Sequence, residues 1–226
     1  MSELILLSSV CRDFPVGGVV VHGLRDVSLA IGRGEYLSIM GPSGSGKSSL
    51  LHTIGLLDRP DRGDYLFDGR NVVHLSDEER ARLRRQRIGF VFQFFHLVPR
   101  LTAAENVELP LMLAEMPARE RHRRVDAILA RLGLADRRHH RPDQLSGGQR
   151  QRVAIARAAV TDPDVLLADE PTGNLDRAAG HEVIAILEEL NAGGITLIMV
   201  THDPAIGDRA RRRIRMEDGA VLPEEK

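Results

Sequence analysis

Short apolar runs of strand length alternate along the chain with segments whose apolar residues recur at helical spacing. The runs predict strands over residues 3–14, 26–31, 35–40, 88–93, 165–169 and 195–201. Strands that alternate with helices are typical of α/β domains in which most strands run parallel. The pattern therefore predicts an α/β fold with a mostly parallel sheet.

Capping residues indicate where several helices begin. Ser76 with Glu79, and Thr102 with Glu105, have the spacing of capping boxes. Pro117 opens a further helix whose apolar residues repeat at i, i+3, i+4 and i+7. Other helices are expected over residues 47–57, 149–160 and 177–190.

Two stretches depart from simple alternation of strands and helices. Residues 94–160 are predicted to form a helical lobe inserted between strands. Residues 63–69 have the turn residues of a small antiparallel β part, and residues 214–222 resemble a closing hairpin that turns at Gly219.

Composition excludes several classes of protein. With 226 residues, 42% hydrophobic and 28% charged, the chain has the make-up of a globular domain. A net charge of −1 gives no overall attraction to nucleic acid. No apolar run is long enough to cross a membrane, the N-terminus lacks the features of a secretory signal, and Cys11 is the single cysteine. We expect a cytoplasmic location.

The segment Gly41–Ser48 matches the phosphate-loop pattern G-x-x-x-x-G-K-[ST] and lies between a predicted strand and a predicted helix. Such a loop turns backbone N–H groups toward phosphate oxygens, while its lysine reaches the β and γ phosphates and its hydroxyl binds Mg²⁺. The candidate nucleotide-binding residues are Gly41, Pro42, Ser43, Gly44, Ser45, Gly46, Lys47 and Ser48. The alternative is an ordinary glycine-rich turn with a solvated lysine.

Two adjacent carboxylates, Asp169 and Glu170, end the apolar strand predicted over residues 165–169. This arrangement places one acid on a metal ion and the second beside an attacking water. Paired acids at the end of a strand also cap loops, so the pair alone does not decide between the two interpretations.

The segment Leu145–Gln149 resembles the signature of ABC-type ATPases, and the resemblance covers residues 5–221. It implies a phosphate-loop NTPase core with a mostly parallel sheet, an antiparallel β subdomain and an inserted helical signature subdomain. The expected organisation is one domain over residues 1–226, with core residues 1–93 and 161–226 and a helical lobe over residues 94–160.

The resemblance also implies roles for individual residues, with ATP and Mg²⁺ as the bound groups. Glu170, His202, Lys47 and Gln93 are the expected catalytic residues, and Ser48, Gln93 and Asp169 the expected metal ligands. The expected dimer loop consists of Asn174, Leu175 and Asp176, and the expected signature consists of Leu145, Ser146, Gly147, Gly148 and Gln149.

The signature also has a physical rationale. Ser146 is a good N-cap, and Gly147 and Gly148 expose backbone donors at the start of a helix, where anions bind. The resemblance implies that a second copy of the chain presents this segment to the nucleotide, so that two ATP molecules lie between two chains. The alternative is a helix cap with no ligand.

Phe14 is the candidate for stacking on adenine, where the family usually has a tyrosine. A phenyl ring still stacks on a base, and the alternative is that Phe14 belongs to the core. Ser49 stands where the family often has threonine, next to Ser48; it is included among the nucleotide-binding residues.

Residues 92–99 and 167–176 resemble the branch that contains lipoprotein-release, macrolide-export and cell-division ATPases. The resemblance implies an ATP-hydrolysing subunit that lies at the cytoplasmic face of the membrane and powers a permease on another polypeptide, of lipoprotein-release or export type. Residues 94–101 are a candidate docking segment for that permease or, alternatively, packing of the helical lobe.

The rival function is a soluble ABC ATPase that acts on nucleic acid or as a cell-division scaffold. Basic clusters at residues 80–87, 119–124 and 209–215 suggest it. Acidic residues interleave the first two clusters, which is typical of solvated helix faces. We therefore expect no nucleic-acid partner.

Overall fold

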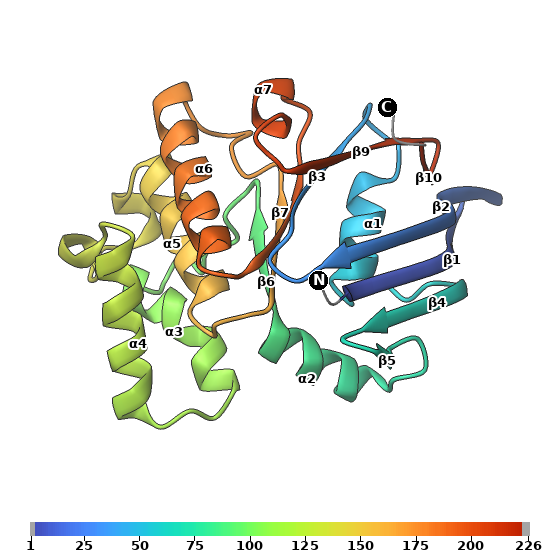
Figure 1. Cartoon of the computed structure of the whole chain (residues 1–226). Helices are drawn as coiled ribbons and strands as arrows, with labels where there is room; N and C mark the ends of the chain where they lie inside the picture. The colour runs from blue at the N-terminus through green and yellow to red at the C-terminus, as the bar shows by residue number, and fades with distance from the viewer. Residues whose placement is uncertain (1–2, 223–226) are drawn as a thin grey trace.

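The computed structural model describes residues 3–222, which form two β-sheets and the helices around them (Figure 1). The strands are β1 (Glu3–Val16), β2 (Val19–Gly32), β3 (Tyr36–Met40), β4 (Arg62–Phe67), β5 (Arg70–Asn71), β6 (Ile88–Phe92), β7 (Val165–Asp169), β8 (Thr196–Val200), β9 (Arg212–Glu217) and β10 (Ala220–Val221). The helices are α1 (Lys47–Ile54), α2 (Asp77–Arg87), α3 (Ala103–Leu113), α4 (Ala118–Arg131), α5 (Gly147–Ala159), α6 (Arg177–Ala192) and α7 (Pro204–Gly207).

The larger sheet has the strand order β10-β9-β3-β8-β7-β6. Strands β9, β3, β8, β7 and β6 pair in parallel, and β10 pairs antiparallel with β9. The predicted mostly parallel sheet is confirmed. Because the carboxyl ends of parallel strands share one edge, the segments that follow β3, β7 and β8 meet there, which is where open α/β sheets bind ligands.

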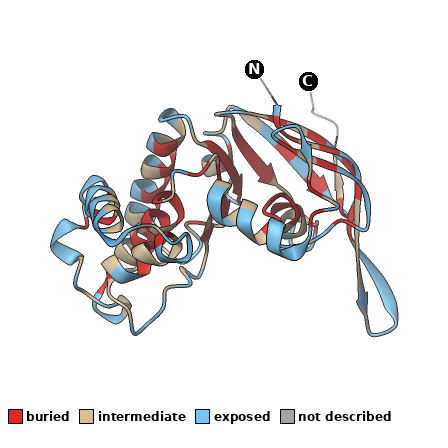
Figure 2. Ribbon diagram, turned by 90° about the horizontal axis from the view of Figure 1, so that it is seen from below, coloured by how far each residue is buried: buried red, intermediate tan, exposed pale blue. Residues whose placement is uncertain are grey.

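The smaller sheet is antiparallel, with the order β2-β1-β4-β5, as predicted for residues 63–69. Strands β1 and β2 pair as far as Val16 and Val19 across a turn at Gly17 and Gly18. This hairpin is longer than the sequence predicted, and it projects from the body with an exposed tip (Figure 2). Its outer part is held by pairing between strands rather than by burial, so it has no alternating apolar pattern.

Two apolar clusters fill the body, and alternate residues of the central strands face one or the other. In β8, Ile198 and Val200 belong to the cluster between the two sheets and α1, while Leu197 and Met199 belong to the cluster beneath α3 to α6. Burial on both faces explains why this strand is a continuous apolar run.

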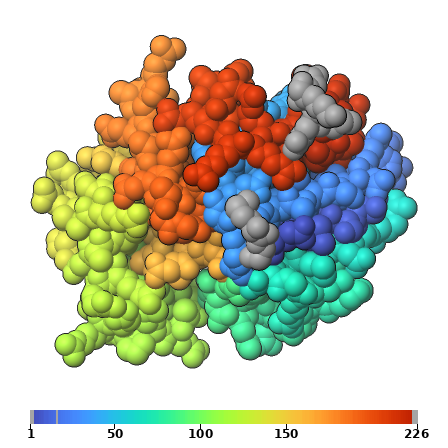
Figure 3. All heavy atoms as spheres, viewed as in Figure 1, coloured from blue at the N-terminus to red at the C-terminus, as the bar shows by residue number. Residues whose placement is uncertain are grey.

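Helices α3, α4 and α5 all lie within residues 94–160 and form one end of the molecule, coloured yellow-green in Figure 3. Helix α5 packs against α3 and α4 and also against β6 and α6. The capping boxes predicted at Ser76 and Thr102 are both present. The helical segment is therefore joined to the sheet mainly through α5.

Several element boundaries differ from the predicted ones, and one strand has a partner that was not predicted. Helix α1 ends at Ile54 rather than at residue 57, and its C-cap, Gly55, lies so close to Phe90 that no side chain fits there. Helix α5 begins at Gly147 rather than at residue 149, because Ser146 is its N-cap. Strand β9 pairs in parallel with β3 in addition to forming the closing hairpin.

Within residues 3–222, no helix is both long enough and apolar enough to cross a membrane.

The two tyrosines of the chain offer a matched test of how α1 is fixed to the smaller sheet. The buried Tyr65 hydroxyl donates to the carbonyl oxygen of Ile54, near the end of α1, over 2.7 Å. Tyr65→Phe leaves that carbonyl without a partner, and we expect the free energy of unfolding to fall by about 1–2 kcal/mol. Urea denaturation followed by circular dichroism measures the change.

Tyr36→Phe is the control. Burial raises the pKa of Tyr36 to about 12, and its hydroxyl has no hydrogen-bond partner among the residues that the structure describes. We expect the stability to change by less than about 0.5 kcal/mol, because no bond is lost. Equal losses for the two variants would contradict the assigned role of Tyr65.

Candidate active site

The loop Gly41–Ser48 leaves the carboxyl end of β3 and enters α1. Gly44 and Gly46 have φ angles of 81° and 97°, which residues with side chains rarely adopt. A methyl group at Gly46 would overlap the carbonyl oxygen of Gly23, whereas one at Gly44 would enter open space. The loop thus packs tightly on β2 at Gly46 and borders open space at Gly44. This arrangement is suited to binding phosphate groups.

Lys47 and Ser48 are the first residues of α1. The Nζ atom of Lys47 donates to the carbonyl oxygens of Gly41, over 2.9 Å, and Pro42, over 2.7 Å. The first turn of a helix also carries N–H groups without helical partners and the positive end of the helix dipole. The loop and helix together present positive charge and donors suited to a phosphate group.

Asp169, the last residue of β7, lies opposite Ser48. The Ser48 hydroxyl donates to Oδ2 of Asp169 over 3.3 Å. Burial raises the pKa of Asp169 above its ordinary value, and the hydrogen bond from Ser48 lowers it in part. Hydroxyl and carboxylate oxygens are ligands that Mg²⁺ prefers, and a cation there would offset the buried negative charge. The pair fits a magnesium site.

Glu170 follows in a constrained backbone conformation with a φ of 47°. Its N–H donates to the carbonyl oxygen of Val200 over 3.0 Å, which fixes it to the end of β8. Its Oε2 atom lies 2.8 Å from Nδ1 of His202. Strained conformations of this kind cluster at functional sites. A carboxylate oriented by an imidazole is suited to accept a proton from a bound water.

An open cavity of about 430 Å³ brings together most of the predicted nucleotide-binding and catalytic residues. It is lined by Phe14, Val21, His22, Gly23, Gly41, Ser43, Gly44, Gly46, Lys47, Ser48, Ser49, Asp169, Glu170, Val200 and His202. The predicted residues Pro42 and Ser45 are not part of this lining. The carbonyl oxygen of Pro42 accepts a hydrogen bond from Nζ of Lys47. Ser45 is buried, and its carbonyl oxygen accepts a hydrogen bond from the N–H of Gly219.

Phe14 lines this cavity and belongs to neither apolar cluster. Its ring lies against Gly23, and the guanidinium of Arg12 lies 4.7 Å from the ring centroid. Arg12 in turn donates to Oδ1 of Asp61 over 3.0 Å. The sequence did not single out Arg12 or Asp61, because only the fold brings them to the ring.

Gln93 follows β6 and is absent from the lining of the cavity. A methyl group at Gly173 would come 2.6 Å from its Nε2 atom, and its carbonyl oxygen accepts from Nδ2 of Asn174 over 3.0 Å. Leu175 is half-buried, and Asp176 caps the start of α6. The predicted dimer loop therefore lies beside Gln93, outside the cavity.

The predicted signature, Leu145–Gln149, forms the beginning of α5. The Ser146 hydroxyl accepts from the N–H of Gln149 over 3.2 Å, and Oε1 of Gln149 accepts from the N–H of Ser146 over 2.9 Å. Gly147 and Gly148 lie against the dimer loop and α6. No signature residue lines the cavity, so this helix start lies apart from the chain's own phosphate loop.

Gln151 is a buried residue that the sequence analysis missed. Its Nε2 atom donates to the carbonyl oxygens of Phe92, over 3.2 Å, and Pro171, over 2.7 Å. It thereby connects α5 to the end of β6 and to the turn after Glu170. The available signal was a polar residue on the same helix face as the apolar Ala154 and Ile155.

The ABC transporter family model matches residues 24–173. A macrolide export ATP-binding/permease protein of Paracoccus denitrificans is 51% identical over 225 residues, covering 100% of this chain and 34% of that protein. An uncharacterized ABC transporter ATP-binding protein of Thermotoga maritima is 50% identical over 221 residues, 98% of this chain and 94% of that protein. The chain thus spans about a third of the length of the macrolide export relatives.

The solved structures agree with the family match. Two dimeric structures of the ATP-binding cassette MJ0796, one of them bound to ADP and Pi, superpose with a TM-score of 0.90. They are 44% and 45% identical to this chain and cover 98% of both chains. The α/β fold is that of the ABC ATPase cassettes, and the chain belongs to the ABC transporter family.

Proposed function

We propose that this chain is the ATP-hydrolysing, nucleotide-binding subunit of an ABC transporter and powers a membrane permease. The observation that carries the proposal is the shared cavity, in which the phosphate loop, Asp169, Glu170 and His202 face one volume although they are distant in sequence. Relatives described as ATP-binding proteins support it.

ATP binds with its base against Phe14 and its phosphates in the loop. Lys47 exchanges its bonds to the carbonyl oxygens of Gly41 and Pro42 for oxygens of the β and γ phosphates. A compact ammonium suits this position, since it is a point charge rather than a planar fork. The N–H groups of the loop and of the first turn of α1 supply the remaining donors.

Ser48 and Asp169 would hold Mg²⁺, with Gln93 as a third ligand. Bound there, Mg²⁺ would neutralise negative charge of the phosphates. Because Gln93 lies outside the cavity lining, its role requires the loop after β6 to move when nucleotide binds. In this proposal, the movement of the loop transmits ATP binding and hydrolysis to the permease.

Glu170 accepts a proton from the attacking water, and His202 orients the carboxylate and contacts the γ phosphate. The water oxygen forms a bond to the γ phosphorus, and the bond from that phosphorus to the β,γ-bridging oxygen breaks. The proton taken by Glu170 passes to solvent, leaving ADP and hydrogen phosphate. Positioning and charge stabilisation carry most of the catalysis in such transfers.

A second copy of the chain completes the site. Leu145–Gln149 lies apart from this chain's own cavity, yet Gly147 and Gly148 stand at a helix start, which favours anions. In the proposed dimer, each signature contacts the γ phosphate held by the other chain, and Asn174–Asp176 cross the interface. The dimeric cassette structures support this arrangement.

An apolar groove of about 600 Å³ beside β6 and α3 suits a helix of the permease. Leu57 and Leu113 are among its lining residues and are 43% and 63% exposed. In the adjoining loop, Phe94 and Val98 are also exposed, while Leu97 packs against the second apolar cluster. Residues 94–101 thus contain both exposed and packed side chains, so Phe94 and Val98 are free to contact the permease while Leu97 packs within the helical lobe.

The location follows from this assignment. We place the chain at the cytoplasmic face of the membrane, held peripherally through the permease. Relatives named macrolide export ATP-binding/permease proteins favour an export-type permease over lipoprotein release.

The rival function on nucleic acid depended on the arginine clusters. In the first cluster, Arg80 and Arg84 donate to backbone carbonyl oxygens in the turn after α1. In the second, Arg123 and Arg124 pair with Glu120. Arginines committed to such internal contacts favour a structural role over binding of a phosphate backbone.

Glu170→Gln tests the assigned proton acceptor. We expect ATP turnover to fall by roughly 100-fold or more, because the amide does not accept the proton. ATP affinity is expected to stay within about threefold, since Lys47 and the loop bind the phosphates. Steady-state ATPase assays, calorimetric titration with ATP and light scattering in Mg-ATP measure turnover, affinity and an accumulated dimer.

Glu182→Gln, at an exposed position on α6, is the matched control and is expected to keep full turnover. Undiminished turnover of the Glu170 variant would remove Glu170 from the mechanism.

Phe14→Ala tests the nucleobase platform. We expect ATP affinity to fall about tenfold, in line with the stacking of one base on one aromatic ring. Tripolyphosphate, which has no base, is expected to bind unchanged, and so is ATP to a Phe94→Ala control. Calorimetry with both ligands separates the cases: unchanged ATP affinity excludes Phe14 from the site, and equal losses for the two ligands indicate a structural role.

Membrane co-purification tests the transport function. Tagged Glu170→Gln protein, solubilised from membranes in Mg-ATP, is expected to bring down a permease in stoichiometric amount, identified by mass spectrometry. Adding Leu113→Arg in the groove is expected to abolish this capture, whereas Val20→Arg at the exposed hairpin tip leaves it intact. Recovery of soluble partners or nucleic acid alone would favour the rival function.

A further inference from the structure

The arginine cluster at residues 209–215 has no role in the proposed site. In β9, Ile214 is buried in the first apolar cluster, so Arg213 and Arg215 point to the opposite face of the sheet. Arg215 pairs in register with Met40, which directly precedes the phosphate loop. The strand register therefore brings this arginine to the mouth of the loop.

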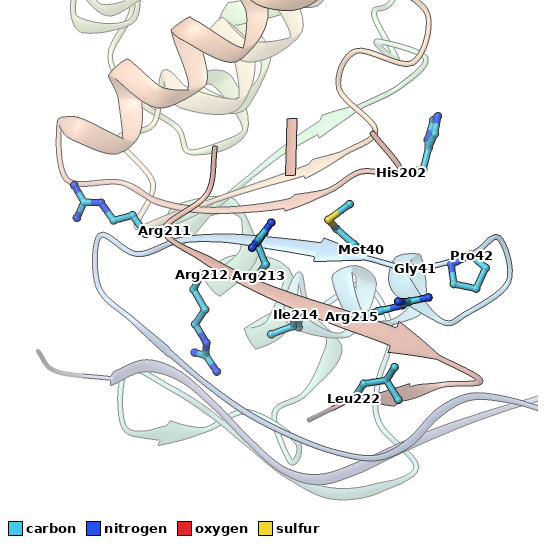
Figure 4. A pocket seen from close by; sticks show the side chains of 10 residues that line it. All are labelled: Met40, Gly41, Pro42, His202, Arg211, Arg212, Arg213, Ile214, Arg215 and Leu222. Carbon is cyan, nitrogen blue, oxygen red and sulfur yellow. The ribbon is translucent and has the colours of Figure 1, made fainter. Parts of the chain in front are cut away.

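A cavity of about 750 Å³ opens beside these arginines. It is lined by Met40, Gly41, Pro42, His202, Arg211, Arg212, Arg213, Ile214, Arg215 and Leu222, none of which is acidic. Arg215 extends toward the phosphate loop at Gly41 and Pro42 (Figure 4). Gly41 and His202 also line the nucleotide cavity, so the two cavities adjoin.

The arginines of this cavity differ in how far their charge is balanced. Arg212 donates to Glu35 over 3.3 Å, and Arg213 pairs with Asp208. Arg215 forms no ion pair with any residue between 3 and 222. An unbalanced guanidinium on a cavity wall attracts anions, and its planar fork matches two oxygens of one phosphate group.

We propose that this cavity is a second anion site, which binds inorganic phosphate through Arg215 and receives the phosphate cleaved from ATP. The binding site follows from the geometry of the cavity; its part in product release rests on the proposed ATPase function. Once the bond has broken and the proton on Glu170 has passed to solvent, hydrogen phosphate lies beside ADP and Glu170, all negatively charged, and is repelled by them. The adjoining cavity, which shares His202 with the nucleotide cavity, provides the positive charge of Arg215 for this phosphate.

Phosphate binding is measured with the phosphate loop already filled. Protein saturated with Mg²⁺ and a non-hydrolysable ATP analogue is dialysed against labelled inorganic phosphate. We expect saturable binding that Arg215→Gln weakens at least about tenfold, because a charged hydrogen-bonding partner is lost. Arg119→Gln, which makes the same charge change at an exposed position of α4, is the matched control and is expected to bind phosphate normally. Absent binding, or equal weakening in both variants, would overturn the site.

Product inhibition of ATP turnover by phosphate provides the second readout. We expect Arg215→Gln to require at least about tenfold more phosphate for half-inhibition, with kcat/KM for ATP within about twofold of the unmodified protein. Wild-type protein that binds phosphate but lacks turnover would refute the proposed function and leave the site standing. Arg215-dependent sedimentation with phosphatidic acid vesicles, together with no binding of free phosphate, would assign the site to a lipid headgroup and overturn the release role.

Discussion

The phosphate loop is clamped between β2 and the turn that joins β9 to β10. The backbone N–H of Gly219 donates to the carbonyl oxygen of Ser45 over 3.0 Å, and the backbone N–H of Arg25 donates to the carbonyl oxygen of Gly219 over 2.8 Å. Gly46 packs directly on the carbonyl group of Gly23. Both sheets thus fix the loop before any ligand arrives, and a binding site held in this way has little conformational entropy left to lose.

The sheets position one part of the proposed site, and loops and helices position the other part. Asp169 ends β7, and Glu170 is bonded to the end of β8, so the sheet sets their positions relative to the loop. Gln93 and the signature lie outside the cavity on loops and helices of the other part. Gln151 connects that part to both β6 and the turn after Glu170. Helix α5 therefore contacts both the groove and the turn that follows Glu170.

Short-range patterns predicted the parts of this architecture that local chemistry determines. The segment Gly41–Ser48, the pair Asp169–Glu170 and the caps at Ser76 and Thr102 are recognisable within a few residues. The parallel pairing of β9 with β3 and the contact of Arg12 with Phe14 were not predicted. Both depend on which distant segments the fold places together. The sequence of a six-residue strand, or of the residues around a single arginine, does not indicate which segment it will contact.

The surroundings of an arginine, together with the presence or absence of an acidic partner, decide what its charge does. Arg119 is exposed on α4 and faces bulk water, where salt screens its charge. Arg33 and Arg87 share Asp68, and their hydrogen bonds hold the pKa of that carboxyl below its ordinary value. Arg215 belongs to neither case, because it lines a cavity that meets the nucleotide site at His202. Its charge therefore acts on the anions that this site handles.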